Sequence, residues 1–213
     1  MSFVYFRLPH TKQVYRNRIT EEPEEIASLA ELNGRRGFVI APFAPTGDSP
    51  ILLLGADFEP VDVADDCRLD ARLIDADYAN ERSRYGVDFE NYHAQLRYGT
   101  FSKIVLARCA RLKATEHIPA LALFARACRK YPRMFIALFS TERSGTWLIA
   151  TPEILVSGEG RDMHTMALAG TMRLSGRNLG FDVEGSGVGK DDIHWSTKNI
   201  QEQRYVEAYI KEC

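Results

Sequence analysis

Apolar and polar residues alternate with a period of two at many places along this chain, and that pattern predicts β-strands. Turn-forming residues such as Pro9 and Gly47 separate neighbouring runs, so hairpins are expected to dominate. The pattern places strands at residues 2–7, 13–18, 37–44, 50–54, 102–112, 134–140, 146–151, 154–157 and 162–168.

Helical spacing is less frequent. It predicts helices at residues 21–33, 77–97 and 118–131, and a last helix from Ser196 or Thr197 to the end of the chain. The segment 77–97 is charged and is expected to be a surface helix, or a pair of helices interrupted near Gly86. Strands outnumber helices and no βαβ alternation is sustained, so the fold class is α+β with largely antiparallel sheets.

Composition excludes several classes of function. The chain has 213 residues, of which 45% are hydrophobic and 26% charged, and its formal net charge is −2. The sequence has no block of Lys and Arg residues that would indicate a nucleic-acid partner. No apolar run approaches the roughly 18 residues of a membrane span. The first residues lack a basic stretch and a cleavage site, so we expect a cytoplasmic protein with its four cysteines reduced.

The glycine-rich stretch 174–190 ends in Gly185-Ser186-Gly187-Val188-Gly189-Lys190, which superficially resembles a phosphate-binding loop. The first glycine is misplaced, Asp191 follows the lysine where Ser or Thr is needed, and no strand precedes it. A phosphate-binding role is therefore not indicated.

Lys103 and Glu153 are the candidate proton-transfer groups. Lys103 opens the apolar strand predicted at 102–112, and Glu153 directly follows the strand predicted at 146–151. Charged groups at the ends of buried strands are costly to desolvate, so their pKa values become adjustable, as general base and general acid chemistry requires. The alternative is that both are ordinary strand-end charges that reach water.

Glu202 is the third candidate. On the last helix it shares one stripe with Val206, Tyr209 and Cys213, so we expect this carboxylate to lie on the apolar face. A carboxylate there needs a partner, which a salt bridge to Lys198 or a tyrosine hydroxyl could also provide.

Four motifs occur in one order along the chain. They are Ser-Lys-Ile-Val-Leu-Ala-Arg at 102–108, Ala-Thr-Pro-Glu-Ile-Leu at 150–155, Leu-Ala-Gly-Thr-Met-Arg at 168–173, and Ser-Thr-Lys-Asn-Ile-Gln-Glu-Gln-Arg-Tyr-Val at 196–206. Together they resemble the chorismate-utilising enzymes, most closely the isochorismate synthases. The resemblance is strong from about residue 98 onwards. It divides the chain into an N-terminal α+β subdomain at 1–97 and the first part of a chorismate-binding catalytic region at 98–213.

The resemblance implies a layered sandwich of antiparallel sheets flanked by helices. It also implies an isomerase that forms isochorismate from chorismate, in which water adds at C2 and the C4 hydroxyl leaves. Lys103 corresponds to the base that activates water, and Glu153 to the acid that protonates the departing hydroxyl. Ala169, Gly170 and Thr171 correspond to the backbone turn that approaches the substrate.

The resemblance also implies Mg²⁺ as cofactor, with Glu202 as a ligand. Lys103 fits the members that use water, because the ammonia-using relatives are expected to carry an amide there. Ala169 stands where the aminodeoxychorismate synthases place a nucleophilic lysine.

The family continues beyond the helix that bears Glu202, so the chain is expected to be the N-terminal portion of such an enzyme and its fold incomplete. The expected pathway is menaquinone or siderophore biosynthesis. Two alternatives stay open: a salicylate synthase, which goes on to eliminate pyruvate, and an inactive fragment that acts only by binding a partner or by self-association.

Overall fold

The computed structural model describes residues 2–18, 21–64, 72–75, 78–173, 175 and 193–212. The chain divides into two compact units, each described by itself below. Unit 1 comprises Met1–Pro132 and Ile136–Ile149, and unit 2 comprises Arg133–Phe135 and Ala150–Cys213. The predicted boundary between 1–97 and 98–213 follows sequence resemblance, and it stays a prediction.

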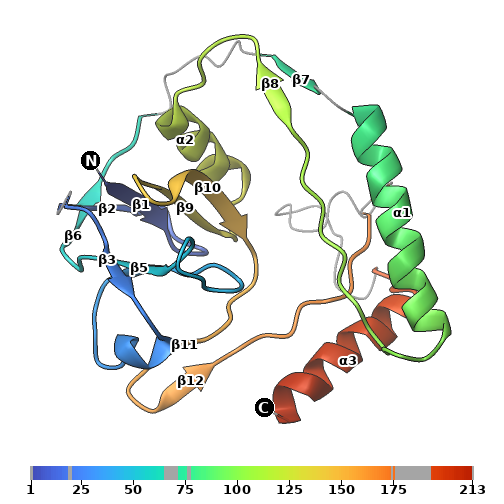
Figure 1. Ribbon diagram of the computed structural model, residues 1–213. Coiled ribbons are helices and arrows are strands. Elements are labelled where there is room, and N and C mark those ends of the chain that lie inside the picture. The colour runs from blue at the N-terminus through green and yellow to red at the C-terminus, as the bar shows by residue number, and fades with distance from the viewer. Residues whose placement is uncertain are drawn as a thin grey trace. The chain divides into compact units, whose positions relative to one another are not determined.

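A five-stranded sheet forms the centre of unit 1 (Figure 1). Its spatial order is β10-β9-β1-β2-β6, and the strands span Gly145–Thr151, Phe135–Thr141, Phe3–Arg7, Val14–Asn17 and Phe58–Val61 respectively. β1 pairs antiparallel with both β2 and β9, and β2 pairs antiparallel with β6. β9 and β10 are hydrogen-bonded neighbours as well. The runs predicted at 2–7 and 13–18, and those at 134–140 and 146–151, therefore form two pairs of adjacent strands, whereas β6 was not predicted.

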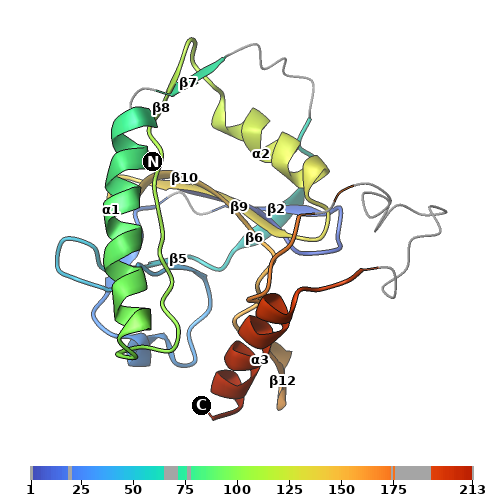
Figure 2. The ribbon, with the colours of Figure 1, turned by 90° about the vertical axis from the view of Figure 1, so that its right-hand side faces the viewer.

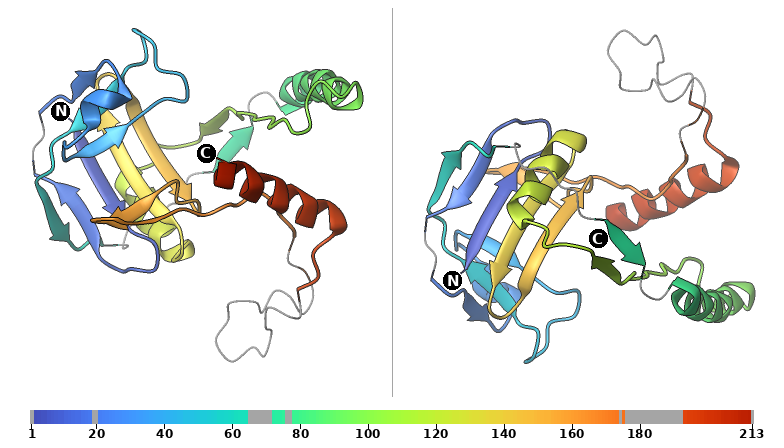
Figure 3. Two further views of the ribbon diagram at one scale, coloured as in Figure 1. Left: turned by 90° about the horizontal axis from the view of Figure 1, so that it is seen from below. Right: turned by 90° about the horizontal axis from the view of Figure 1, so that it is seen from above.

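A three-stranded antiparallel sheet, in the order β3-β5-β4, covers one face of this sheet (Figure 3). Its strands are Glu24–Ile26, Ile51–Leu54 and Phe38–Ile40. Val4 and its cross-strand partner Phe139 form a buried cluster with Leu54, against which Phe6 and Phe38 also pack. Burial of these side chains between the sheets is the main favourable term for this half of the unit.

Helix α2 (Ala120–Lys130), which its amphipathic pattern predicts, covers the opposite face of the sheet. Phe124 is fully buried, and its ring centroid lies 6.1 Å from that of Tyr5 on β1. The buried Arg7 donates to the Tyr131 and Pro132 carbonyl oxygens at 2.6 and 2.7 Å, just beyond the helix. A cation at a helix C-terminus is favourable because the unpaired carbonyls carry partial negative charge.

Helix α1 (Tyr78–Arg97) is one uninterrupted helix with no buried residue (Figure 2). The alternative of a helix pair broken near Gly86 is wrong, because one interior glycine costs only about 1 kcal/mol of helix stability. The helix ends at Arg97, and two residues further Gly99 has a positive φ of 73°, which suits the glycine that follows a helix C-terminus. Beyond it, Leu112–Ala114 (β8) pairs with Leu73–Asp75 (β7).

Two predicted elements of unit 1 are wrong. Residues 21–33 form strand β3 and a short 3₁₀-helix, Leu29–Leu32 (η1), instead of an α-helix, because Ile26 pairs with Ile51 and is buried beside it. Residues 102–111 form no strand, and of the predicted strand 102–112 only Leu112, the first residue of β8, is in a strand. A strand needs a hydrogen-bonded neighbour, and no described strand lies against this segment.

Unit 2 contains the hairpin of β11 (Ser157–Glu159) and β12 (Asp162–His164), followed by helix α3 (Thr197–Glu212). The strand predicted at 154–157 is displaced to 157–159, and the strand predicted at 162–168 is limited to 162–164. The last helix is confirmed. Ser196 caps this helix, since its Oγ accepts a hydrogen bond from the Asn199 N–H at 3.2 Å. The glycine-rich stretch with its phosphate-loop-like segment lies outside the described residues, apart from Ser175.

Both units combine antiparallel sheets with helices, so the chain has the α+β class expected for part of a layered chorismate-binding fold. Among the described residues, no helix combines the length and apolar character that a membrane span requires.

Candidate functional site

Lys103 lies in unit 1, on the extended segment between α1 and β8. Its side chain is half-buried together with those of Ile104 and Leu106, whereas Val105 is largely exposed. Lys103 does not lie in a strand, although the sequence predicts one at 102–112. Its predicted role as a base is a separate matter and stays a prediction.

Glu153 lies in unit 2, two residues after β10 ends at Thr151. The predicted position just after a strand is therefore confirmed. The Glu153 N–H donates to Thr151 Oγ1 at 3.2 Å, which fixes the backbone where the chain leaves the strand. The Glu153 side chain is exposed within this unit, and the role of this carboxyl group as an acid stays a prediction.

Lys103 and Glu153 thus belong to different compact units. Their meeting across a shared cleft stays a prediction.

In unit 2, α3 holds the predicted substrate turn 169–171 through two amide side chains. Gln203 accepts from the Ala169 N–H at 2.9 Å and donates through Nε2 to the Ala167 carbonyl oxygen. Asn199 donates through Nδ2 to the Thr171 carbonyl oxygen at 2.7 Å. Three backbone polar groups of residues 167–171 are therefore satisfied by one face of the helix, which positions this turn.

Gly170 has a packing role in this arrangement. A Cβ atom on Gly170 would lie 2.8 Å from the Asn199 carbonyl oxygen, closer than a carbon atom can approach without displacement of the helix. The sequence predicts that this glycine permits close approach of the substrate. The structure shows that it permits close approach of α3.

Glu202 lies on α3 beside these two amides, and its side chain is 31% exposed. Its Oε2 accepts from Lys198 Nζ at 3.3 Å, the partner that the sequence offers as an alternative to a metal ion. The predicted inward stripe is partly wrong, because Tyr209 is 66% exposed. The half-buried residues of this face include Asn199, Gln203, Val206 and Ile210, and Cys213 lies outside the described residues.

The metal prediction rests on Glu202 alone. No group of three or more His, Cys, Asp or Glu side chains suited to a metal ion is found among the described residues. Mg²⁺ prefers oxygen ligands and is often held by only one or two protein carboxylates, with water and substrate oxygens completing its shell. A half-buried carboxylate on the helix that also carries Asn199 and Gln203 fits one such ligand position.

Asn199 and Gln203 are the site residues that the sequence reasoning missed. Both belong to the fourth motif, and their i, i+4 spacing places them on one helix face next to Glu202. This spacing of two amides was the available signal, because amide side chains can satisfy both N–H and C=O groups of a neighbouring backbone.

Comparison with known proteins identifies the family. The family model described as chorismate binding enzyme matches residues 63–213, a range that contains all four motifs and begins upstream of residue 98. Neither the curated proteins nor the solved structures gave a match. Since the matched range is well over half of the chain, this protein belongs to the chorismate binding enzyme family.

Proposed function

We propose that the protein acts as an isochorismate synthase, a Mg²⁺-dependent isomerase that converts chorismate to isochorismate and supplies menaquinone or siderophore biosynthesis. The observation that supports this most is the family match over 63–213, which includes Lys103, Glu153, the turn 169–171 and Glu202. Within the family, Lys103 favours a water-using member, and Ala169 disfavours the aminodeoxychorismate synthases.

In the proposed mechanism, Lys103 Nζ in its neutral form removes a proton from a water molecule. The water oxygen forms a bond to C2 of the ring, the C1=C2 double bond shifts to C1=C6, the C5=C6 double bond shifts to C4=C5, and the C4–O bond breaks. Glu153 in its protonated form donates its proton to the departing hydroxyl, which leaves as water. One water enters and one leaves, so the product is an isomer of the substrate, and the two residues exchange protonation states.

The turn 169–171 would present its backbone to a substrate carboxylate, in a position that Asn199 and Gln203 fix. Glu202 would contribute one ligand to Mg²⁺. The ion would neutralise carboxylate charge on the substrate when bound.

Incubation of the protein with chorismate and MgCl₂, followed by chromatography of the products, tests this proposal. Isochorismate without pyruvate is expected. Salicylate with an equivalent of pyruvate would instead identify a salicylate synthase. A complete lack of chorismate conversion, together with self-association in solution, would favour the inactive fragment.

Lys103→Gln tests the assigned base, and Lys113→Gln on β8 is its matched control, since it removes an exposed lysine from the same unit. Loss of a general base is expected to lower kcat about 10²–10⁴-fold with little change in KM. An unchanged kcat in Lys103→Gln would remove this lysine from the mechanism.

A further inference from the structure

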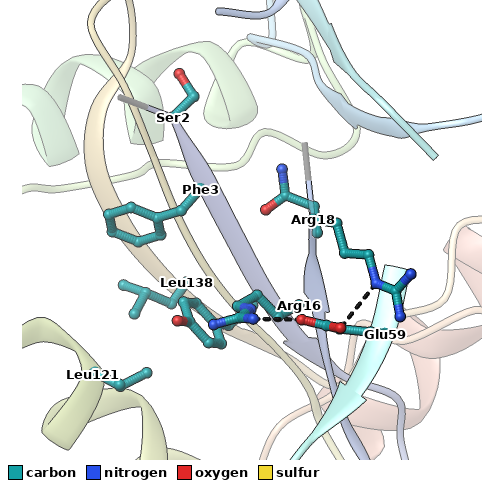
Figure 4. Close-up of a pocket in the computed structure, with 9 residues that line it drawn as sticks. Ser2, Phe3, Arg16, Arg18, Glu59, Leu121 and Leu138 are labelled. Atoms are coloured by element: carbon teal, nitrogen blue, oxygen red, sulfur yellow. Dashed lines mark hydrogen bonds and ion pairs between the residues drawn. The ribbon is translucent and has the colours of Figure 1, made fainter. Parts of the chain in front are cut away.

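Unit 1 contains a cavity on the α2 face of the five-stranded sheet (Figure 4). Its volume is about 530 Å³, within the range of roughly 300–1,000 Å³ usual for small-molecule sites. Most of its lining lies on β1, β2 and β6, upstream of residue 63, where the family match begins. The cavity is thus separate from every residue assigned to chorismate chemistry above.

A row of cross-strand neighbours gives the cavity one apolar and one charged side. The row crosses β9, β1, β2 and β6 in that order, and its members are Leu138, Tyr5, Arg16 and Glu59. Residues in register on adjacent strands point to the same face of a sheet. The contact between Tyr5 and Phe124 shows that this is the face covered by α2.

The charged side carries more positive than negative charge. Glu59 accepts from Arg16 Nη2 through one carboxylate oxygen, and from Arg18 Nε at 2.8 Å through the other. Hydrogen bonds from Arg16 and Arg18 hold the pKa of Glu59 below its usual range, so it is ionised at pH 7. Two guanidinium groups around one carboxylate leave a net charge of +1. Each guanidinium has five N–H donors, so this ion pair leaves donors for another acceptor.

The apolar side is partly aromatic. Phe3 and Tyr5 lie edge to face with ring centroids 6.0 Å apart, and Leu121 of α2 also lines the cavity (Figure 4). Ser2 also lines the cavity and is fully buried, and its hydroxyl has no hydrogen-bond partner among the described residues. Buried hydroxyl groups are normally satisfied, so a polar atom of a ligand or a water molecule is expected beside it.

We propose that this cavity binds a small monocarboxylate with a flat, apolar ring, whose carboxylate meets Arg16 and Arg18 while its ring lies against Phe3, Tyr5 and Leu121. The net charge of +1 selects one negative charge, and a guanidinium group binds a carboxylate through two parallel hydrogen bonds. This site lies outside the proposed active site and does not depend on the proposed reaction.

Calorimetric titration of the whole 213-residue chain with 2-naphthoate tests the proposal. A dissociation constant on the order of 1 mM or below is expected for a ligand of this size. The neutral isostere 2-naphthamide is expected to bind at least about tenfold more weakly, because it cannot form charge-assisted hydrogen bonds.

Two tryptophan variants on α2 locate the binding site. Leu121→Trp fills the apolar side of the cavity and is expected to abolish binding. Leu123→Trp is the matched control, because Leu123 has nearly the same exposure (36% against 39%) but does not line this cavity. Thermal unfolding without ligand shows whether each variant folds. If Leu121→Trp does not fold, Arg18→Gln on the exposed side of the cavity replaces it, with an expected loss of about tenfold or more in affinity.

Lys103→Gln distinguishes this site from the proposed active site, and it is expected to leave 2-naphthoate binding unchanged. Loss of binding in Lys103→Gln would place the ligand in the active site and overturn the proposal. Equal binding of 2-naphthamide, undiminished binding in the cavity variants, or no binding to the unmodified protein would overturn it as well.

Discussion

Gln203→Ala tests whether the hydrogen bonds from α3 hold residues 167–171, which include the turn 169–171. The substitution removes the acceptor for the Ala169 N–H and the donor for the Ala167 carbonyl oxygen. A typical intramolecular hydrogen bond contributes about 0.5–1.5 kcal/mol net, so the loss of two should destabilise this local structure by about 1–3 kcal/mol.

Amide hydrogen exchange at Ala169 measures this effect directly. A loss of about 1–3 kcal/mol corresponds to an exchange rate about 5- to 140-fold faster, since each 1.4 kcal/mol is a factor of ten. Gln201→Ala is the matched control, because it removes an exposed glutamine two residues away on the same helix. Gln203→Glu should accelerate exchange less than Gln203→Ala at pH 7, since the carboxylate still accepts from Ala169.

Equal Ala169 exchange rates in Gln203→Ala and Gln201→Ala would refute this reasoning. It would mean that the side-chain hydrogen bonds do not determine the position of the turn, and that α3 and residues 167–171 are positioned by other contacts.

Three further substitutions test the packing and the charges of the two units. Gly170→Ala should destabilise unit 2 by about 1–3 kcal/mol in urea unfolding, because the added Cβ would overlap with the Asn199 backbone. Gly86→Ala is the control: the space around Gly86 is open, so alanine there should stabilise α1 by about 0.5–1 kcal/mol. Phe124→Ala should destabilise unit 1 by about 3–5 kcal/mol in the same assay, because this ring of α2 is fully buried against the five-stranded sheet. A loss below 1 kcal/mol would contradict that packing. Glu59 has a lowered pKa in the folded state, so its ionised form stabilises the fold above its ordinary pKa of 4.5, and this contribution is lost as the pH falls below that value. The difference in stability between the unmodified protein and Glu59→Gln should therefore shrink from pH 6 to pH 3, and a difference independent of pH would contradict the ion pair.

The elements that could be predicted from the sequence are those whose determinants are local. The hairpins β1–β2 and β9–β10 each follow from two alternating runs and the turn between them. Helix α2 follows from its apolar spacing, and α3 from its cap at Ser196. In each case the residues that determine the element lie within one short stretch of chain.

The wrong predictions depend on distant partners. Residues 24–26 form a strand because β5, about 25 positions further along, offers Ile51 to pair with Ile26. The acidic residues and the proline nearby favour a helix start, but burial of Ile26 between neighbours outweighs that preference. Residues 102–111 have the apolar content of a strand, yet no described strand provides the hydrogen-bonding partner.

The candidate site follows the same rule: residues within one motif could be predicted from the sequence, whereas contacts between motifs could not. The third motif identified the turn 169–171 and the fourth identified Glu202, but neither indicated that the helix bearing Glu202 is hydrogen-bonded to this turn. That connection is made by Asn199 and Gln203, whose side chains satisfy the turn backbone from the face that also carries Glu202. Because one rigid helix bears all three side chains, displacement of the helix would move the turn and the carboxylate together. The third and fourth motifs are therefore packed and hydrogen-bonded to each other. Gly170 is required because it lets the helix approach closely enough to make these hydrogen bonds.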